Sequence, residues 1–231
     1  MDGFFTTNGI NCMGYYLQQD LPFYYSLFSD FTLCANYFYP VLGPTYPNRF
    51  YLVGGTSGGI TNNQWGFGIF DYPIILDLLE DAGVSWKVYN TSWDPVPPGD
   101  SDNVFVFWKR WANDNRTRGS MADYLADLKH DRLPQAPQLD AYGLGFLVPT
   151  WVISPFAKKA HPEPTVYEHS SILKFIEAVF GLPTLASVNH RFDVSTPGTD
   201  NDAANGNPVG PPAPPRDGRR DIGDMLECFQ F

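Results

Sequence analysis

The sequence predicts an α/β domain followed by a loosely packed tail. Two observations predict it: several segments carry apolar residues at helical spacing, and short apolar segments typical of strands lie between them. Hydrophobic residues make up 43% of the 231 residues and aromatic residues 16%, which is enough to bury a core. Residues 71–89 give the clearest unit, because a helical pattern, one glycine and an alternating strand resemble half of a βαβ unit.

The expected helices are amphipathic and carry recognisable start or stop residues. Asp20 precedes a proline in the first helical turn, and Ser120 is suited to accept a hydrogen bond from a free amide at a helix start. Gly83 and Gly181 follow helical patterns and are typical of helix ends. The helices are expected over residues 20–31, 71–82, 121–129 and 168–180.

The expected strands are short and apolar and cover residues 50–53, 84–89 and 148–154. Three prolines and a glycine within residues 39–49 predict a loop there. Residues 105–111 are strongly apolar and aromatic, and their pattern does not distinguish strand from helix.

The composition divides the chain into three parts. Residues 1–195 form the expected α/β domain, and residues 196–220 are rich in Pro, Gly, Asn and Asp and are expected to be disordered or loose. Residues 221–231 contain apolar side chains that are expected to dock back onto the domain.

Charge and cysteine usage exclude several classes of function. The net charge of −10 argues against nucleic-acid binding and against electrostatic docking on anionic membranes. No apolar run is long enough to span a bilayer, and no signal peptide is visible. Cys12, Cys34 and Cys228 form no CxxC pair, which argues against a zinc ribbon. Compartment and oligomeric state stay undetermined at this point.

Residues 43–49 hold the most informative motif, Gly-Pro-Thr-Tyr-Pro-Asn-Arg. Prolines stiffen the segment, the Arg49 guanidinium suits phosphate oxygens, and Asn48 can donate to a third oxygen. The Thr45 hydroxyl is a candidate nucleophile, but it needs a metal or a base to lower its pKa. The alternative is a structural turn in which Arg49 ties down a neighbouring loop.

Two further residues are candidates for chemistry. His169 opens the last predicted helix, where free amides favour an anion; alternatively, Ser170 merely caps the helix and His169 lies on the surface. Residues 55–59 match GxSxG around Ser57, but a poor helix start follows, so a glycine-rich turn is the favoured interpretation and a serine hydrolase the weaker one.

Residues 1 to about 190 resemble the bacterial and plant phosphoesterase family of phosphatidylcholine-type phospholipases C and related acid phosphatases. The segments that carry the resemblance are residues 13–16, 20–25, 42–49, 148–155 and 168–171. The resemblance implies a partial alkaline-phosphatase-like α/β sandwich with a mainly parallel sheet flanked by helices. It also implies a hydrolase that acts on a phosphate ester or a phospholipid.

The resemblance implies roles for four residues. Thr45 matches the nucleophile that accepts the phosphoryl group, Asn48 and Arg49 are expected to shape the site or to contact phosphate, and His169 is expected near the active site. Such enzymes depend on a divalent metal.

Two departures from the family pattern affect the expected metal. A Glu-Asn-Arg-Ser-Phe-Asp segment that supplies metal ligands would precede Met1, and an acidic segment would lie where Gln135 runs directly into Ala136. The main metal ligands are therefore expected to be absent from this chain, with none identifiable beyond Thr45. The sequence therefore predicts a hydrolase whose activity is impaired. The alternative is a non-catalytic remnant that binds phosphate or a lipid head group.

Overall fold

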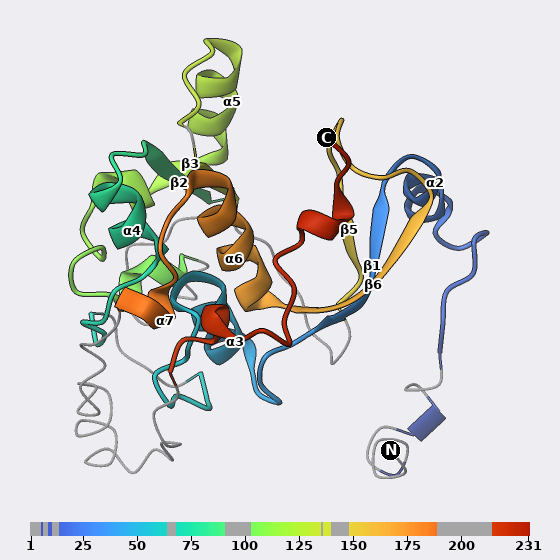
Figure 1. Ribbon diagram of the computed structural model, residues 1–231, viewed down its shortest axis with the longest axis horizontal. Coiled ribbons are helices and arrows are strands. Elements are labelled where there is room, and N and C mark those ends of the chain that lie inside the picture. Colours follow the sequence, from blue (N-terminus) through green and yellow to red (C-terminus); the bar gives the residue numbers. More distant parts are fainter. Residues whose placement is uncertain are drawn as a thin grey trace. The chain divides into compact units, whose positions relative to one another are not determined.

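The computed structural model describes residues 6, 9–10, 14–63, 68–90, 103–134, 136–139, 148–188 and 214–231, with the backbone alone for residues 136–139. The chain forms two compact units (Figure 1). The first comprises residues 1–35, 149–164 and 228–231, and the second comprises residues 36–148 and 165–227. The predicted division at residues 195 and 220 stays a prediction.

The first unit is built around a short antiparallel ladder. Strand β1 (Thr32–Phe38) pairs with β5 (Thr150–Val152) and also neighbours β6 (His161–Glu168), in the order β5-β1-β6. Helix α2 (Pro22–Asp30) precedes β1 and confirms the expected first helix, but no residue of it is buried. Strand β5 is shorter than predicted and half-buried, because residues 150–152 lie at the edge of the sheet.

The second unit contains a small parallel sheet. Strand β2 (Trp86–Asn90) lies between β3 (Gly119–Ser120) and β4 (Ala136–Leu139) and pairs with both in parallel. The mixed α/β class is therefore observed. A single, mainly parallel sheet is not confirmed, since the described strands form two three-stranded sheets, one of which holds the antiparallel β1–β5 pair.

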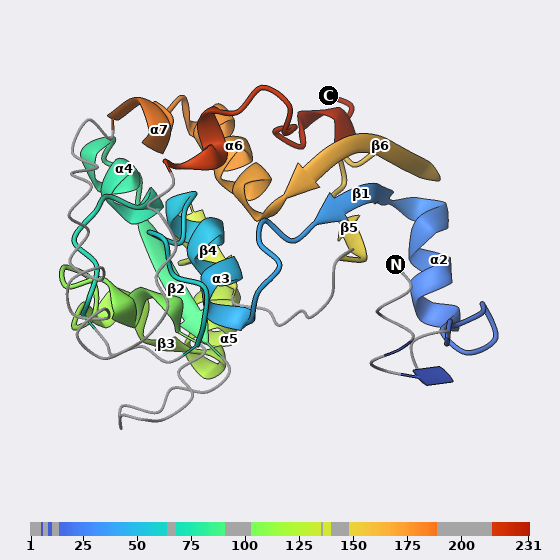
Figure 2. The same cartoon turned by 90° about the horizontal axis from the view of Figure 1, so that it is seen from below.

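Helices cover the core of the second unit. They are α3 (Thr45–Gly54), α4 (Ile75–Asp81), α5 (Met121–Lys129), α6 (His169–Phe180) and α7 (Leu185–Val188), with 3-10 turns η2 (Val104–Phe107), η3 (Asn115–Thr117), η4 (Arg216–Gly218) and η5 (Leu226–Cys228), the last ending at the unit boundary. Helices α3 and α6 pack side by side (Figure 2). None of the helices in the described part of the chain is long and apolar enough to cross a membrane.

Aromatic rings fill the interior between these helices. Phe50 of α3 is fully buried and meets the rings of Phe70, Phe107 and Trp108 edge-on, at centroid distances of 5.0, 5.0 and 5.6 Å. Edge-to-face pairs of this kind contribute about 0.5–1.5 kcal/mol each beyond the burial of apolar area. The cluster fixes α3 against the apolar segment 104–108, which forms a 3-10 turn and a bridge residue.

Several local predictions are confirmed by cap geometry. Ser120 accepts a hydrogen bond from the Asp123 amide at the start of α5, and Asp123 bonds back to the Ser120 amide. Gly181 ends α6 in the left-handed conformation, with φ of 64°. Helix α4 lies within the predicted helix at residues 71–82, and strand β2 ends one residue beyond the predicted strand at residues 84–89.

The predicted strand at residues 50–53 is wrong, and the predicted loop at residues 39–49 is observed only as far as residue 44, because α3 occupies residues 45–54. Pro44 is the N-cap and Pro47 lies in the first turn, where a proline loses no intrahelical hydrogen bond. The prolines that predicted a loop therefore start a helix.

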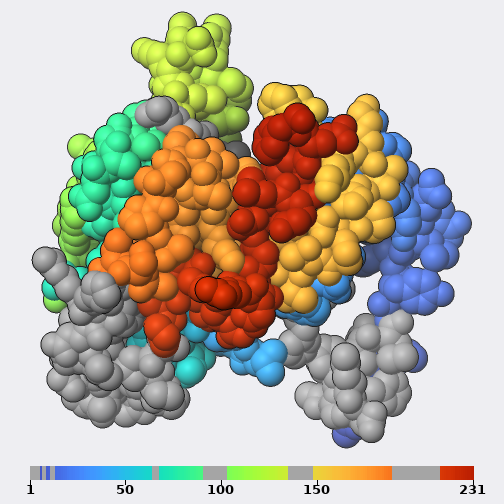
Figure 3. Space-filling model, in the orientation of Figure 1, coloured from blue at the N-terminus to red at the C-terminus, as the bar shows by residue number. Residues whose placement is uncertain are grey.

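The segment that includes η4 packs against α6 and α7 (Figure 3). Asp217 is 1% exposed and accepts from the Ala186 amide at 3.3 Å. Glu177 of α6 is 3% exposed and accepts from the Leu185 amide at 3.3 Å. Burial, and then the charge of Asp217, raise the pKa of Glu177 to about 9. The two carboxyl groups therefore hold one proton between them near neutral pH.

Glu177→Gln is expected to stabilise the protein at mildly alkaline pH. Because the folded-state pKa of Glu177, about 9, lies above its usual 4.5, its contribution to stability is complete below the lower value and is lost as pH rises through the higher one. The free energy of unfolding should fall by up to about 1.4 kcal/mol per pH unit across this window. Urea unfolding at several pH values should show a shallower slope for Glu177→Gln.

The matched control is Asp81→Asn, at an exposed position of α4. Its pH profile should follow that of the unsubstituted chain. If Glu177→Gln and Asp81→Asn gave parallel profiles, the buried carboxyl pair would not hold a proton.

Candidate functional site

The start of α3 presents Thr45 on a loop held by Asn48. Thr45 is the first residue of the helix and is half-buried. The Asn48 amide donates to the carbonyl oxygens of Gly43 and Pro44, both at 3.0 Å, and its side-chain oxygen accepts from the Val41 amide at 3.2 Å. Asn48 is 4% exposed, so these bonds are sheltered from water. Its observed role is to fix the loop before Thr45.

Few backbone amides are available at this helix start. The first four amides of a helix have no partner within it. Here Pro44 and Pro47 have no N–H, and the Tyr46 N–H donates to the Asn63 side-chain oxygen at 3.0 Å. Of the four, the Thr45 amide is left, so an anion at this position would depend mainly on side chains.

Arg49 lies one turn after Thr45 and is 6% exposed. A buried guanidinium requires partners, because desolvating an uncompensated charge is costly. Its burial places the side chain inside the second unit rather than on the open surface. Both sequence interpretations, phosphate contact and a tie to a neighbouring loop, are compatible with this position.

His169 is the first residue of α6, is half-buried and lies among tyrosines. Its Nδ1 is 3.2 Å from the Tyr37 hydroxyl, and its ring meets the Tyr39 ring edge-on at 5.0 Å. Desolvation lowers the pKa of His169 to about 4, so the imidazole is neutral at neutral pH. A neutral ring can donate or accept one hydrogen bond, but it cannot attract phosphate as a cation.

Arg216 joins the start of α6 to the loop before α3. Its Nη2 is 2.7 Å from Oε2 of Glu168, the residue before His169, and its Nη1 donates to the Pro40 carbonyl at 2.7 Å. The guanidinium also lies over the Tyr51 ring, 5.5 Å from its centroid. Glu168 is 4% exposed; burial raises its pKa, while the charge of Arg216 opposes that shift.

These contacts relate Thr45 and His169 through their elements. Helices α3 and α6 pack together, and His169 touches Tyr37 and Tyr39, which lead into the loop that ends at Thr45. Among the residues placed by the structure, no acidic or histidine side chain is hydrogen-bonded to the Thr45 hydroxyl. The sequence did not predict the contacts of Arg216. This residue lies within the segment expected to be loose, where no periodic pattern of apolar residues marks a helix or strand.

Ser57 does not form a nucleophile elbow. Such an elbow requires a strand before the serine and a helix after it. Here helix α3 precedes it, Gly55 ends that helix with φ of 67°, and Ser57 is 4% exposed in a turn. The serine-hydrolase interpretation is therefore contradicted by the local backbone.

The described residues do not fit a divalent-metal site. Within the placed parts of the chain, no three His, Cys, Asp or Glu side chains form a group that would hold a metal ion. A magnesium or calcium site would need several oxygen ligands converging on one point.

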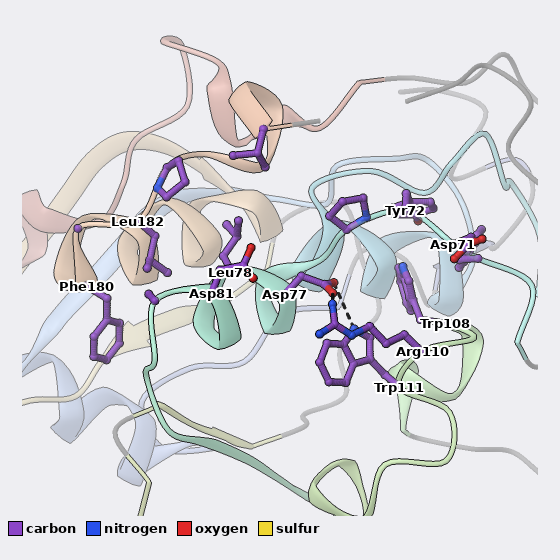
Figure 4. A pocket seen from close by; sticks show the side chains of 16 residues that line it. Asp71, Tyr72, Asp77, Leu78, Asp81, Trp108, Arg110, Trp111, Phe180 and Leu182 are labelled. Carbon is purple, nitrogen blue, oxygen red and sulfur yellow. Dashed lines mark hydrogen bonds and ion pairs between the residues drawn. The ribbon is translucent and has the colours of Figure 1, made fainter. Parts of the chain in front are cut away.

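The second unit also contains a pocket of about 800 Å³ that lies apart from these residues (Figure 4). Neither Thr45, Asn48, Arg49 nor His169 lines it. Its central carboxylate, Asp77, is occupied by structural contacts: it bonds the Arg110 guanidinium, the Trp111 indole N–H at 3.2 Å and the Ile74 amide at 2.9 Å.

The comparison with a protein family and the comparison with individual proteins agree on the kind of protein that this chain resembles. The phosphoesterase family model matches residues 1–139 and 134–183. Phospholipase C B of Mycobacterium tuberculosis is 32% identical over 173 residues, which cover 65% of this chain and 30% of that protein. Non-hemolytic phospholipase C of Burkholderia pseudomallei is 28% identical over 229 residues, covering 83% of this chain and 30% of that protein. The chain thus spans about 30% of the length of these curated relatives.

Arg216→Ala is expected to destabilise the second unit by about 3–5 kcal/mol, because it leaves the buried Glu168 without its cation. Arg216→Ala combined with Glu168→Gln should recover part of this loss, since the carboxylate that Arg216 neutralises is removed as well. The measurement is the free energy of urea unfolding for the single and double variants.

The matched control for this cycle is Arg219→Ala. Arg219 pairs with Asp221 at an exposed position, with side chains 47% and 64% exposed, so its loss should change stability by less than about 1 kcal/mol. Equal effects of Arg216→Ala and Arg219→Ala would contradict the structural role assigned to Arg216.

His169 is expected to stay neutral well below neutral pH. Because its folded-state pKa, about 4, lies below the usual 6.5, its contribution to stability is present above the higher value and is lost as pH falls through the lower one. NMR titration of the four histidine rings, with the His169 signal identified by its loss in His169→Gln, tests this. A His169 midpoint at or above the ordinary value would mean that the ring is solvated.

Proposed function

Because the chain belongs to the phosphoesterase family, we propose that it carries the nucleophile segment of a phospholipase C-like hydrolase of phosphate esters, with Thr45 as the residue that accepts the phosphoryl group. The observation that carries this proposal is the position of Thr45 at the first turn of α3, on a loop that Asn48 holds with three hydrogen bonds. The named relatives are phospholipases C, which supports a phosphate ester or phospholipid as substrate.

The proposed reaction has two displacement steps. The Thr45 oxygen attacks phosphorus, a new O–P bond forms as the ester bond breaks, and the proton of the hydroxyl ends on the departing alcohol. Water then attacks the phosphoryl-threonine, which releases phosphate or a phosphate monoester and restores the hydroxyl. A fixed loop favours this chemistry, because holding the nucleophile in place removes part of the entropy cost of the attack.

The other residues take supporting roles in this proposal. Asn48 positions the loop, and Arg49 neutralises charge on the phosphoryl oxygens from the interior side of α3. His169, neutral and surrounded by tyrosines, positions the Tyr37 end of β1 and does not carry charge in the reaction.

The proposed reaction requires a group that activates the Thr45 hydroxyl. An alcohol is a poor nucleophile at neutral pH unless a base or a metal lowers its pKa. The family's divalent metal would supply this, but the described residues do not offer its ligand set. We therefore propose that the isolated 231-residue chain turns over phosphate esters only weakly.

A proposed internal deletion between Gln135 and Ala136 fits this impairment. The family model matches the chain in two stretches that overlap at residues 134–139, which supports the junction. An alkaline-phosphatase-like sandwich also stays a proposal, supported by the parallel β3-β2-β4 sheet, whose strand β4 begins at the junction.

Turnover of p-nitrophenyl phosphate and p-nitrophenylphosphorylcholine, with and without chelator, tests the proposal. Thr45→Val keeps the shape of the side chain and removes the hydroxyl, whereas Thr45→Ser keeps a hydroxyl. We expect weak turnover that Thr45→Val abolishes and Thr45→Ser retains in part, with a loss in Thr45→Val of at least about 100-fold.

The possible outcomes test the role of Thr45 as nucleophile separately from the impaired activity of the chain. Turnover that Thr45→Val leaves unchanged contradicts the role of Thr45. Strong, chelator-sensitive turnover contradicts the impairment, because it requires a complete metal site. Binding of inorganic phosphate without any turnover, measured by calorimetry and weakened by Arg49→Lys, supports the non-catalytic remnant instead.

A further inference from the structure

Two of the three cysteines of the chain meet inside the first unit. Cys34 lies on β1 and Cys228 lies at the end of η5, 194 positions later, and their sulfur atoms are 3.8 Å apart. Cys34 is 3% exposed and Cys228 is fully buried. Neither sulfur atom is part of a disulfide in this structure. The third cysteine, Cys12, lies outside the described residues.

Backbone pairing holds both cysteines in place. Cys34 is in register with Thr150 in the β1–β5 ladder. On the other side, the Lys158 amide donates to the Cys228 carbonyl at 2.9 Å, and the buried Thr32 hydroxyl lies 2.9 Å from that same carbonyl. The contact between the sulfur atoms is thus set by the β1–β5 ladder on one side and by hydrogen bonds to the Cys228 carbonyl on the other.

We propose that Cys34 and Cys228 form a disulfide under oxidising conditions, which fastens residues 228–231 to β1. The bond forms when the two thiols lose two protons and pass two electrons to a small-molecule disulfide, which is reduced to two thiols. A disulfide needs the sulfur atoms at about 2.05 Å, so they must approach from van der Waals contact. Rotation of one or both thiol side chains provides movement of this size.

The surroundings make the thiol pair slow to react while it stays buried. The hydrogen bond to Cys228 and then burial raise the pKa of Cys34 far above its ordinary value, so little thiolate is present. The thiolate is the form that attacks a disulfide. Oxidation therefore requires opening of residues 228–231, or occurs during folding before the segment docks. Once formed, the same burial shields the bond from reductants.

Docking of the last residues is the step that controls this access. The Gln230 amide donates to the Phe156 carbonyl at 2.9 Å, and Phe229 bridges Ala157. The final residue, Phe231, is 91% exposed. Because opening of residues 228–231 breaks only part of the contacts of the first unit, it costs less than global unfolding, so oxidant reaches the pair in the folded chain on a slow timescale.

The test compares the full chain after refolding in oxidised glutathione and in dithiothreitol, with free thiols alkylated before digestion. Mass spectrometry should find a peptide that links Cys34 to Cys228 in the oxidised sample, and free thiols should fall from three to one per chain. This measurement needs no substitution, so it does not depend on whether a variant folds.

Thermal unfolding gives an independent readout. Oxidation should raise the melting temperature by about 5–10 °C, since the bond closes a very long loop. The rise should vanish in Cys34→Ser and Cys228→Ser and persist in Cys12→Ser, the matched control. Free Cys34 and Cys228 after refolding in oxidant, or a link that involves Cys12 instead, would overturn the proposal.

Discussion

The guanidinium of Arg216 is the constraint on which the geometry of the candidate site depends. It bonds a carboxylate at the start of α6 and a carbonyl in the loop before α3, at 2.7 Å each. Since Glu168 is almost fully buried, its charge is tolerable only beside a cation. The positions of His169 and of the loop that leads to Thr45 are thus tied to the docking of a segment near the C-terminus.

The segment that contains η4 also contacts α6 through a second pair of side chains. In this pair a shared proton, rather than a cation, makes the contact favourable. Asp217 directly follows Arg216 and is buried beside Glu177. One carboxyl must stay protonated for the two to share this space, because two adjacent buried charges of the same sign repel strongly. The 3-10 turn η4 therefore contacts α6 through the ion pair of Arg216 and through the shared proton at Asp217.

Much of the local structure could be predicted where one residue decides it. Ser120 and Gly181 mark helix boundaries because each cap is decided locally, by the Ser120 hydroxyl at one helix start and by the left-handed backbone that glycine adopts at the other helix end. The strand expected at residues 50–53 failed because apolar residues at both faces fit a buried helix as well as a strand, and the aromatic core around Phe50 favours the helix. Arg216 was beyond prediction, since its partners lie 48 or more positions away in sequence and tertiary packing alone brings them together.

The candidate site holds its nucleophile firmly but offers little to activate it. Asn48 fixes the loop and prolines remove two of the four amides that would otherwise attract an anion, so reactivity at Thr45 rests on groups beyond those the described residues supply. The most direct measurement is mass spectrometry of chain quenched in acid during incubation with p-nitrophenyl phosphate. We expect one added phosphoryl group on the peptide that contains Thr45, at low occupancy, and none in Thr45→Val. A phosphoryl group on another residue, or an unmodified Thr45 peptide throughout, would contradict it.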